Sequence, residues 1–546
     1  MNTGTFMNRR TTSARRVACA VAAVMTVVSL AAAPSAATAQ TRAARGPFDV
    51  LVRGGRVLDG SGNAWIRADV GVRGDSIVAV GDLGGATAGT VLDATGLYVA
   101  PGFIDTHSHA GGALETAELS GARPLLAQGV TTVFVNPDGG GSVDLAAQRR
   151  DLLEHGLGVN VALMVPHGSV RQEVLGMADR APSPAEMARM EELVRRGMEE
   201  GAFALSSGPF YAPGSFAKTD ELVALARIAA RYGAPYQSHI RDESDYTIGL
   251  LAAVEEVITV AREAGTRGVV THVKALGPSV WGFSAAIVNR VERARAEGVE
   301  VFADQYPYEA SSTSLAAALV PRWAQAGGGD SLRARLANAG QRSRIVAEMR
   351  ENLARRGGAE RIRISRHAAD STVEGLTLAA IAARQGVDAV ETAIALVTAG
   401  GPQVVSFNMH DDDIERLMRQ PWTMTASDGS LVRAGSGVPH PRGNGAFARK
   451  LRHYAVEEAV VDLPFAIRSM TSLPATVYNL RDRGWIRSGA RADLVVFDLG
   501  GLRDVATFDD PHRIAEGMVH VLVNGRLAIR DGEFTDELAG QVLRRR

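Results

Sequence analysis

The stretch Tyr98-Val99-Ala100-Pro101-Gly102-Phe103-Ile104-Asp105-Thr106-His107-Ser108-His109 decides the predicted fold, because an apolar strand within it ends in a His-x-His motif. Side chains two residues apart on a strand point to the same face, so His107 and His109 are expected to direct two imidazoles at one point. Neutral imidazole is a common ligand of zinc and related divalent metals. Two solvent-facing histidines on a loop are the alternative interpretation, and the rest of the chain has to decide between the two.

The middle of the chain alternates short apolar strands with amphipathic helices, as repeated βα units do. We expect helices such as 184–200, 219–232 and 246–264, and eight strands at 98–107, 130–135, 159–165, 202–206, 235–240, 268–274, 299–306 and 423–427. Eight such units predict an α/β fold, a distorted (β/α)8 TIM-like barrel, whose chemistry lies at the carboxyl ends of the strands. A doubly wound sheet is the main alternative, but no Gly-x-Gly-x-x-Gly fingerprint follows the first strand.

The two ends of the chain differ from the middle. Residues 48–97 and 481–540 contain short alternating strands separated by Gly and Asp, which predicts one small β-sandwich domain built from both chain ends. The barrel is then expected over residues 98–480. A long segment at about 309–421 separates the last two barrel strands and has helices of its own, so we expect an insertion over the barrel mouth.

The first 39 residues have the pattern of a signal peptide. Arginines at 9, 10, 15 and 16 precede an apolar run from Val17 to about Ala33, and Ala37-Thr38-Ala39 fits a cleavage site, which leaves Gln40 to begin a short linker at 40–47. The run is short and Ala-rich for a membrane anchor. We therefore expect a periplasmic or secreted protein with no stable membrane span after cleavage; the route, Sec or Tat, stays open.

Composition limits the partners and the ligands. The 546 residues carry a formal net charge of -1, which gives no indication of a nucleic-acid partner. The only cysteine, Cys19, lies inside the predicted signal peptide, so the mature chain is expected to have no thiolate. Any metal site must then use histidine and oxygen ligands. The oligomeric state is not readable from the sequence.

Metal-compatible residues stand at four predicted strand ends. His107 and His109 end the first strand, His239 the fifth, His272 the sixth and Asp428 the eighth. Each of them alone could be a buried or surface residue without a ligand role. Because the carboxyl ends of barrel strands converge on one rim, their joint placement favours a metal site.

At this point the chain resembles a known family, the D-aminoacylases (N-acyl-D-amino-acid deacylases) of the amidohydrolase superfamily. The resemblance spans about 48–540 and is carried by the motifs at 101–109, 238–243, 271–274, 304–308, 427–429 and 440–442. The family implies one or two divalent ions, usually zinc (Zn2+). It implies His107 and His109 on one metal, and His239 and His272 on the other.

The resemblance also implies roles in binding and catalysis. Asp428 would be the general acid/base and would approach the first metal. Lys274, Tyr306 and Arg442 would grip the carboxylate of the substrate, and Tyr211 would help to orient the amide carbonyl.

One position departs from the family pattern. The family often has Gly-Asn-Cys-Gly after the second strand, with the cysteine as a metal ligand, whereas this chain has Asn136-Pro137-Asp138-Gly139. A carboxylate can bind zinc and can bridge two metals, so we expect Asp138 to replace the cysteine. The alternative is that Asp138 only stabilises a turn. Because oxygen is a harder ligand than sulfur, other divalent ions are possible at this site and the number of metals stays open.

The reaction implied by the resemblance is hydrolysis of the amide bond of an N-acyl-D-amino acid to a carboxylate and a free D-amino acid. A metal-activated hydroxide would attack, with Asp428 moving the proton. A dipeptidase for dipeptides with a C-terminal D-residue is the alternative. A cyclic-amide hydrolase is less expected, because its usual bridging lysine is missing from 201–208. A metal-free scaffold is also less expected, because the histidines and Asp428 are all present.

Overall fold

The computed structural model describes Met1 and residues 47–545. Apart from Met1 and Pro47, the predicted signal peptide and linker lie outside the described residues. Among the helices that are described, none combines the length and the apolar character needed to cross a membrane.

Strands from both ends of the chain pair in one nine-stranded sheet. Its order is β21-β20-β19-β18-β5-β1-β2-β3, with β4 beside β1. Strand β18 pairs antiparallel with β5, with Leu494 opposite Pro101. A hydrophobic cluster that includes Val52, Val70 and Leu494 draws on both ends of the chain, so the apolar core beside this sheet is built from both. The strand bounds are β1 Phe48–Val57, β2 Ile66–Arg73, β3 Ser76–Gly81, β4 Ala88–Asp93, β5 Tyr98–Pro101, β18 Leu494–Phe497, β19 Met518–Val523, β20 Arg526–Arg530 and β21 Glu533–Phe534.

Eight parallel strand positions form the distorted (β/α)8 barrel, in chain order around it. Strands β8 and β9 are two parts of the third barrel strand. The sheet β6-β7-β8 supplies positions one to three, and the sheet β17-β13-β12-β11-β10-β9 continues from the third position to the eighth. All these pairs are parallel. The bounds are β6 Phe103–Asp105, β7 Val130–Val135, β8 Asn160–Leu163, β9 Val165–Pro166, β10 Leu205–Ser207, β11 Tyr236–Ser238, β12 Gly268–Val270, β13 Val301–Gln305 and β17 Thr423–Thr425.

The stretch that decided the predicted fold contains two strands where one was predicted. Strand β5 belongs to the terminal sheet, β6 belongs to the barrel, and Gly102 separates them. A side chain at Gly102 would overlap Thr131 on β7, so only glycine allows this close crossing. The single strand predicted at 98–107 was therefore wrong, although its end still brings His107 to the barrel rim.

The barrel helices follow the predicted pattern with small changes at their ends. Helix α6 begins with a capping box, since Ser183 accepts from the backbone of Glu186 and Glu186 reaches back, and it buries Met190, Leu193 and Val194. Helix α8 begins at Leu250 and not at Tyr246, because Asp242 accepts hydrogen bonds from the backbone N–H groups of the loop before it. The longer barrel helices are α4 Leu145–Leu153, α5 His167–Leu175, α6 Pro184–Glu199, α7 Thr219–Arg231, α8 Leu250–Ala264, α9 Ser284–Ala296, α15 Asp411–Met418, α16 Arg442–Arg449 and α17 Leu463–Met470.

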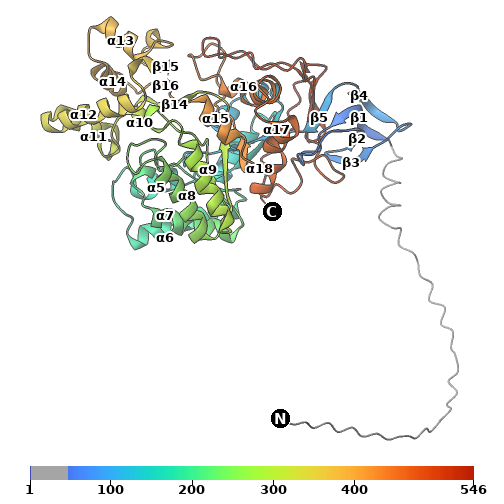
Figure 1. The fold of residues 1–546 in the computed structure, drawn as a ribbon, viewed down its shortest axis with the longest axis horizontal. Helices are drawn as coiled ribbons and strands as arrows, with labels where there is room; N and C mark the ends of the chain where they lie inside the picture. Colours follow the sequence, from blue (N-terminus) through green and yellow to red (C-terminus); the bar gives the residue numbers. More distant parts are fainter. Residues whose placement is uncertain (2–46, 546) are drawn as a thin grey trace.

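The part of the chain from Ala310 to Phe407, between β13 and β17, forms a lobe with its own core. Its three antiparallel strands have the order β14-β16-β15, and buried residues such as Ile345, Met349 and Val404 pack together beside them. In Figure 1 the lobe and the strands β1 to β5 lie at opposite ends of the molecule. The lobe comprises β14 Ala310–Ser314, α10 Leu315–Leu319, α11 Gly328–Ala337, α12 Ala339–Arg355, β15 Ile362–Arg366, α13 Leu378–Gln385, α14 Ala389–Thr398 and β16 Gln403–Phe407.

Candidate metal centre and substrate cavity

The end of the first barrel strand is tied to the end of the eighth. Asp105, the last residue of β6, accepts hydrogen bonds from the backbone N of Ser427 at 2.9 Å and from its hydroxyl at 2.5 Å. Burial raises the pKa of Asp105 to about 6, and the bonds from Ser427 oppose that rise. The contact holds the buried His107 and the partly exposed His109, whose side chain is 35% exposed, beside the eighth strand.

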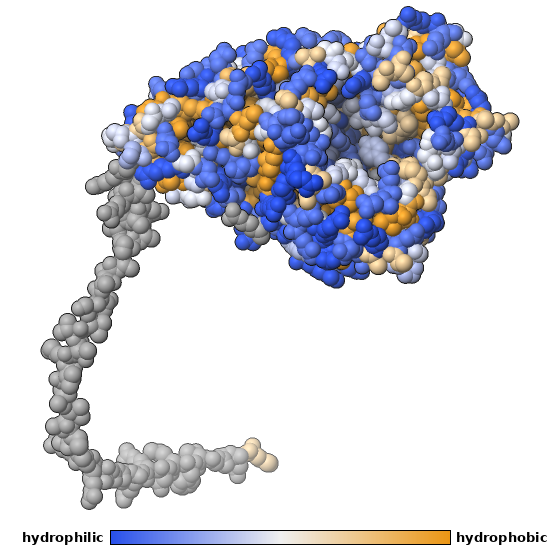
Figure 2. Space-filling view, turned by 180° about the vertical axis from the view of Figure 1, so that it is seen from behind, coloured by the Kyte–Doolittle hydropathy of each residue, from blue (hydrophilic) through white to orange (hydrophobic). Residues whose placement is uncertain are grey.

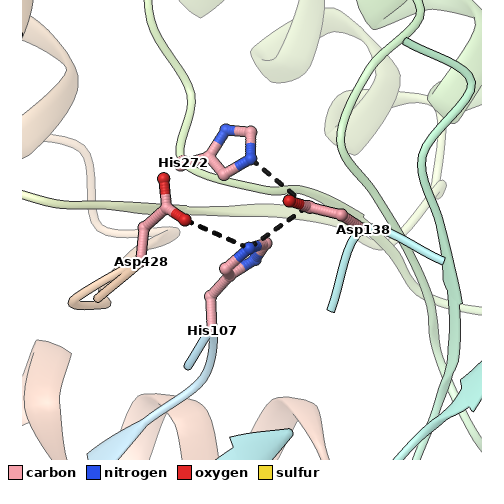
Figure 3. A group of neighbouring side chains, drawn as sticks. All are labelled: His107, Asp138, His272 and Asp428. Atoms are coloured by element: carbon pink, nitrogen blue, oxygen red, sulfur yellow. Dashed lines mark ion pairs between the residues drawn. The ribbon is translucent and has the colours of Figure 1, made fainter. Parts of the chain in front are cut away.

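The Asp138 carboxylate lies at the centre of the four predicted histidine ligands (Figure 3 shows two of them). Its Oδ1 lies 3.2 Å from His107 Nε2, 3.5 Å from His239 Nδ1 and 3.5 Å from His272 Nε2. Its Oδ2 lies 3.4 Å from His109 Nε2. These distances place Asp138 between the two histidine pairs, where one carboxylate could contact two metal ions.

The loop after β7 holds Asp138 in a backbone conformation that few residues adopt. Asp138 has φ +56° and Asn136 has φ +67°. The backbone N of Gly139 donates to Ser206 Oγ at 3.1 Å. A Cβ at Gly208 would overlap the carbonyl oxygen of Asp138, so the loop and the end of β10 meet backbone to backbone.

His272 and its neighbour strand are joined by a buried aspartate. The backbone N of His272 donates to Asp304 Oδ1 at 2.6 Å, and Thr106 Oγ1 donates to Asp304 Oδ2 at 3.2 Å. His272 itself has φ +34°. Asp304 thus links the ends of the first, sixth and seventh strands and fixes the backbone from which His272 projects.

Asp428 contacts both the histidines and a buried arginine. Its backbone N donates to His107 O at 2.9 Å, and its Oδ1 lies 3.1 Å from His109 Nε2. Its Oδ2 accepts from Arg442 Nη1 at 2.6 Å. Figure 3 shows the Asp428 and Asp138 carboxylates on either side of His107.

Electrostatics keep the two central carboxylates ionised. Burial alone raises the pKa of Asp138 and of Asp428, but the surrounding imidazoles outweigh it for Asp138 and Arg442 outweighs it for Asp428. Both pKa values are held well below their usual range. Burial raises the pKa of Tyr211 well above its usual value, so its hydroxyl keeps its proton and can donate a hydrogen bond.

Glu243 is a residue of the site to which the sequence analysis assigned no role. Its Oε1 accepts from Lys274 Nζ at 2.5 Å and lies 3.2 Å from His272 Nδ1, and its Oε2 lies 3.7 Å from His239 Nε2. Burial raises its pKa, but Lys274 and the imidazoles outweigh burial and lower it. Its place at the end of the motif at 238–243, four residues after His239, is the signal from which a role could have been predicted.

The buried donor set fits a divalent cation. Both ring nitrogens of His107, both of His239 and Oδ1 of Asp138 are buried and make no hydrogen bond in the described part of the chain. Such atoms are costly to leave unsatisfied, and a bound cation is the partner that imidazole nitrogen and carboxylate oxygen share. Two groups have ligand atoms within 4.8 Å of one another: His107, Asp138, His272 and Asp428, and His239, Glu243 and His272.

A cavity of about 440 Å³ opens over these ligands, and its wall includes His109, Asp138, His239 and Asp428. Strand β14 of the lobe supplies part of the opposite wall, and Figure 2 shows a hollow beside the lobe. The four predicted substrate-binding residues also line this cavity: Lys274, Tyr306, Arg442 and Tyr211. The structure therefore brings the predicted ligands and the predicted binding residues together at one rim.

Three of the predicted binding residues form one cluster. Lys274 Nζ lies 5.5 Å and Arg442 Cζ 4.6 Å from the ring centre of Tyr306. Tyr211 stands apart from them: its ring packs on His239 at 4.6 Å, and its hydroxyl accepts from Thr313 Oγ1 at 3.3 Å. The lobe thus contacts the residue that was expected to orient the amide carbonyl.

Comparison with known proteins identifies the family. The chain matches the model of the amidohydrolase family called Amidohydro_3 over residues 90–529. It is 37% identical to the N-acyl-D-glutamate deacylase of Alcaligenes xylosoxydans xylosoxydans, over 91% of this chain and 97% of that protein. The chain belongs to the D-aminoacylase family of amidohydrolases. The D-aminoacylase of the same organism is 34% identical over 91% of this chain and 98% of its own length.

A solved structure from this D-aminoacylase family has the same fold. The N-acyl-D-glutamate deacylase of Bordetella bronchiseptica aligns with a TM-score of 0.78 and 34% identity, covering 91% of this chain and all of that chain. It was solved with zinc and with a phosphonate inhibitor that mimics the tetrahedral intermediate of the reaction. The expected family and barrel are therefore confirmed.

Proposed function

We propose that this chain is a zinc-dependent N-acyl-D-amino-acid deacylase. The observation that carries the proposal is the Asp138 carboxylate, which lies among four imidazoles and lines a cavity whose wall also contains Asp428, Lys274 and Arg442. Two relatives that align with 91% of this chain are named N-acyl-D-glutamate deacylase and D-aminoacylase.

The ligands we propose are the six predicted residues, with Asp138 shared between the two histidine pairs and Glu243 beside His239 and His272. A divalent metal bound by these residues would polarise the scissile carbonyl and lower the pKa of a water molecule to about 7. The donor set consists of imidazole and carboxylate, which zinc accepts and which other divalent ions also accept.

The protein's own groups then move the proton and hold the substrate. Asp428 is ionised and lies beside the histidines, so it can accept the proton of the attacking water and return it to the leaving amine. Tyr211 keeps its proton and can donate to the oxygen on which negative charge develops. The cluster of Lys274, Tyr306 and Arg442 offers two cations and a hydroxyl to the α-carboxylate of the substrate.

Direct assay tests this function. Purified protein is expected to contain zinc and to hydrolyse N-acetyl-D-amino acids faster than the L-enantiomers by at least two orders of magnitude. L-Xaa-D-Xaa dipeptides and a hydantoin belong on the same panel, because they represent the dipeptidase and cyclic-amide alternatives. If the zinc-loaded protein cleaves dipeptides or hydantoins but no N-acyl-D-amino acid, the deacylase proposal is wrong. If it cleaves nothing and binds no divalent metal, the scaffold alternative gains support.

We also propose that the protein is exported and acts in the periplasm or outside the cell. The support is the basic segment, the apolar run and the Ala37-Thr38-Ala39 site in the printed sequence. N-terminal sequencing of the protein from a bacterial periplasmic fraction is expected to start at Gln40. An uncleaved chain confined to the cytoplasmic fraction would contradict export without affecting the proposed reaction.

A further inference from the structure

Three arginines surround the half-buried ring of Tyr246, in the loop after β11. Their Cζ atoms lie 5.7 Å (Arg355), 5.9 Å (Arg356) and 6.0 Å (Arg322) from the ring centre. Arg322, Arg355 and Arg356 all come from the lobe segment between β14 and β15, whereas Tyr246 belongs to the barrel. Three guanidinium groups are therefore gathered where the lobe meets the barrel.

Only one of the three has a carboxylate partner. Arg355 Nε lies 3.2 Å from Asp245 Oδ1, and its Nη2 lies 3.6 Å from Glu351 Oε2. Within residues 47–545, neither Arg356 nor Arg322 has a carboxylate oxygen within 4.0 Å of its guanidinium. The positive charge around Tyr246 is therefore only partly balanced by the protein.

Arg356 has few other partners. It is 1% exposed, its Nη1 donates to Ser406 Oγ at 3.1 Å, and its buried Nε makes no hydrogen bond to any described residue. Arg322 is similar, since its Nη1 donates to Ala317 O at 2.8 Å while its buried Nη2 has no partner. Burial lowers the pKa of Arg322 to about 10, so it is still a cation at neutral pH. Buried charges with free donors are costly unless an anion pairs with them.

Arg356 lines the same cavity as the metal ligands. The other cations of that cavity already face carboxylates, since Lys274 contacts Glu243 at 2.5 Å and Arg442 contacts Asp428 at 2.6 Å. The cavity wall near the lobe is polar rather than apolar; it includes Ser311, Ser312, Thr313, Ser314 and Gln403. This side of the cavity suits a charged group of the substrate better than an aliphatic one.

We propose that Arg356, with Arg322 behind it, forms a second anion subsite that binds the side-chain carboxylate of an acidic D-amino acid. This inference rests on the proposed deacylase function and specifies its substrate class: N-acyl derivatives of dicarboxylic D-amino acids. The α-carboxylate goes to the cluster of Lys274, Tyr306 and Arg442, and the second carboxylate goes to Arg356. An arginine guanidinium can bind a carboxylate with two parallel hydrogen bonds. The Nε of Arg356, which has no partner among the described residues, is available to donate one of them.

The test compares substrates that differ only in charge. N-acetyl-D-glutamate and N-acetyl-D-glutamine have nearly the same shape, and N-acetyl-D-aspartate and N-acetyl-D-leucine complete the panel. The zinc-loaded wild-type protein is expected to prefer D-glutamate or D-aspartate over D-glutamine by about 100-fold in kcat/KM, the size of a buried charge-assisted contact. A wild-type protein that hydrolyses D-glutamine or D-leucine as well as the acidic substrates overturns the subsite and leaves the deacylase function standing.

Variants of the arginines test whether Arg356 is the residue that causes the preference for acidic substrates. Arg356→Met is expected to reduce the acidic-to-glutamine ratio to within about threefold of one, and Arg356→Lys is expected to retain part of it, since lysine keeps the charge without the fork. Arg355→Met is the matched control, because Arg355 adjoins the same ring but is already paired, and it is expected to keep the wild-type ratio. Zinc content and melting temperature show that each variant is folded. An Arg356→Met protein that is folded and keeps the acidic preference overturns the assignment to Arg356.

Failure of this inference is distinguishable from failure of the proposed function. If no N-acyl-D-amino acid of the panel is cleaved by zinc-loaded protein, the function itself is wrong. If the neutral substrates are cleaved and the acidic ones are not preferred, only the second anion subsite is wrong.

Discussion

Arg442 Nη1 lies 2.6 Å from Asp428 Oδ2, so the proposed general acid/base is held by the same arginine that lines the substrate cavity. The other oxygen of Asp428 faces His109 Nε2 at 3.1 Å. One carboxylate is thus oriented from the substrate side and from the metal side at once. An ionised group fixed in this way can accept a proton without first having to reorient.

Asp428→Asn removes the proton acceptor while it keeps the shape of the side chain. We expect kcat to fall by about 10² to 10⁴, the usual contribution of a positioned general base. Zinc content, measured by mass spectrometry of the purified protein, is expected to stay close to that of the wild type, because the other ligands remain. A variant that keeps its zinc and loses less than tenfold in kcat would exclude Asp428 as the essential proton carrier.

Asp138→Ala removes the carboxylate between the two histidine pairs. We expect the affinity for zinc to drop about tenfold or more, measured by competition with a chelator. Asp138→Cys is the informative partner variant, because it restores the thiolate expected at this position in the family and is expected to bind zinc at least as well as the wild type. Equal zinc affinity in the Ala variant and the wild type would show that Asp138 is not a ligand.

Gly208→Ala places a methyl group against the carbonyl oxygen of Asp138. We expect the free energy of unfolding to fall by about 1 to 3 kcal/mol, since the backbone must shift to admit the methyl. Gly112→Ala is the control, because a Cβ there meets nothing within 4 Å. Thermal or urea denaturation of the two variants makes the comparison. A Gly208→Ala protein as stable as the control would mean that the backbone of the Asp138 loop can shift at little cost in free energy.

Lys450 gives a prediction on pH. It is buried below the barrel rim, where its Nζ donates to Thr425 Oγ1 at 2.8 Å and to Ser469 Oγ at 2.9 Å. Burial lowers its pKa from 10.5 to about 7. Between about pH 7 and 10.5 the unfolded chain binds more protons at this group than the folded chain, so this group makes the stability rise with pH across that window.

Lys450→Met removes the buried charge. We expect it to stabilise the protein by about 1 to 3 kcal/mol at pH 6.5 and by clearly less at pH 9.5, where the wild-type amine is already neutral. Denaturation at the two pH values measures the difference. Lys218→Met, at an exposed position, is expected to have the same small effect at both. A stabilisation by Lys450→Met that does not depend on pH would contradict the proposed origin in a buried charge.

Local patterns predicted the barrel and most of its elements. The strand at 130–135 and the helix starts at Pro184 and Thr219 agree with the structure, because apolar period and capping residues are local properties. The first strand was predicted too long, since nothing in an apolar run distinguishes two short strands that belong to different sheets. Only the packing of Gly102 against Thr131 in the tertiary structure shows where β5 ends and β6 begins. Glu243 was overlooked for a similar reason, because its shortest contacts, with Lys274 and His272, are with side chains that follow another strand.

By itself, the sequence determined which groups are available: imidazoles and carboxylates at the ends of apolar strands, with no cysteine outside the first 39 residues. The tertiary structure decided how they are used. It placed Asp138 among four imidazoles through a loop with positive φ, and it left Arg356 buried beside the cavity with no carboxylate partner among the residues that the structure describes. The physical reason is that donor chemistry is a property of single residues. Distances between groups far apart in the chain depend on how the barrel closes and where the lobe packs on it.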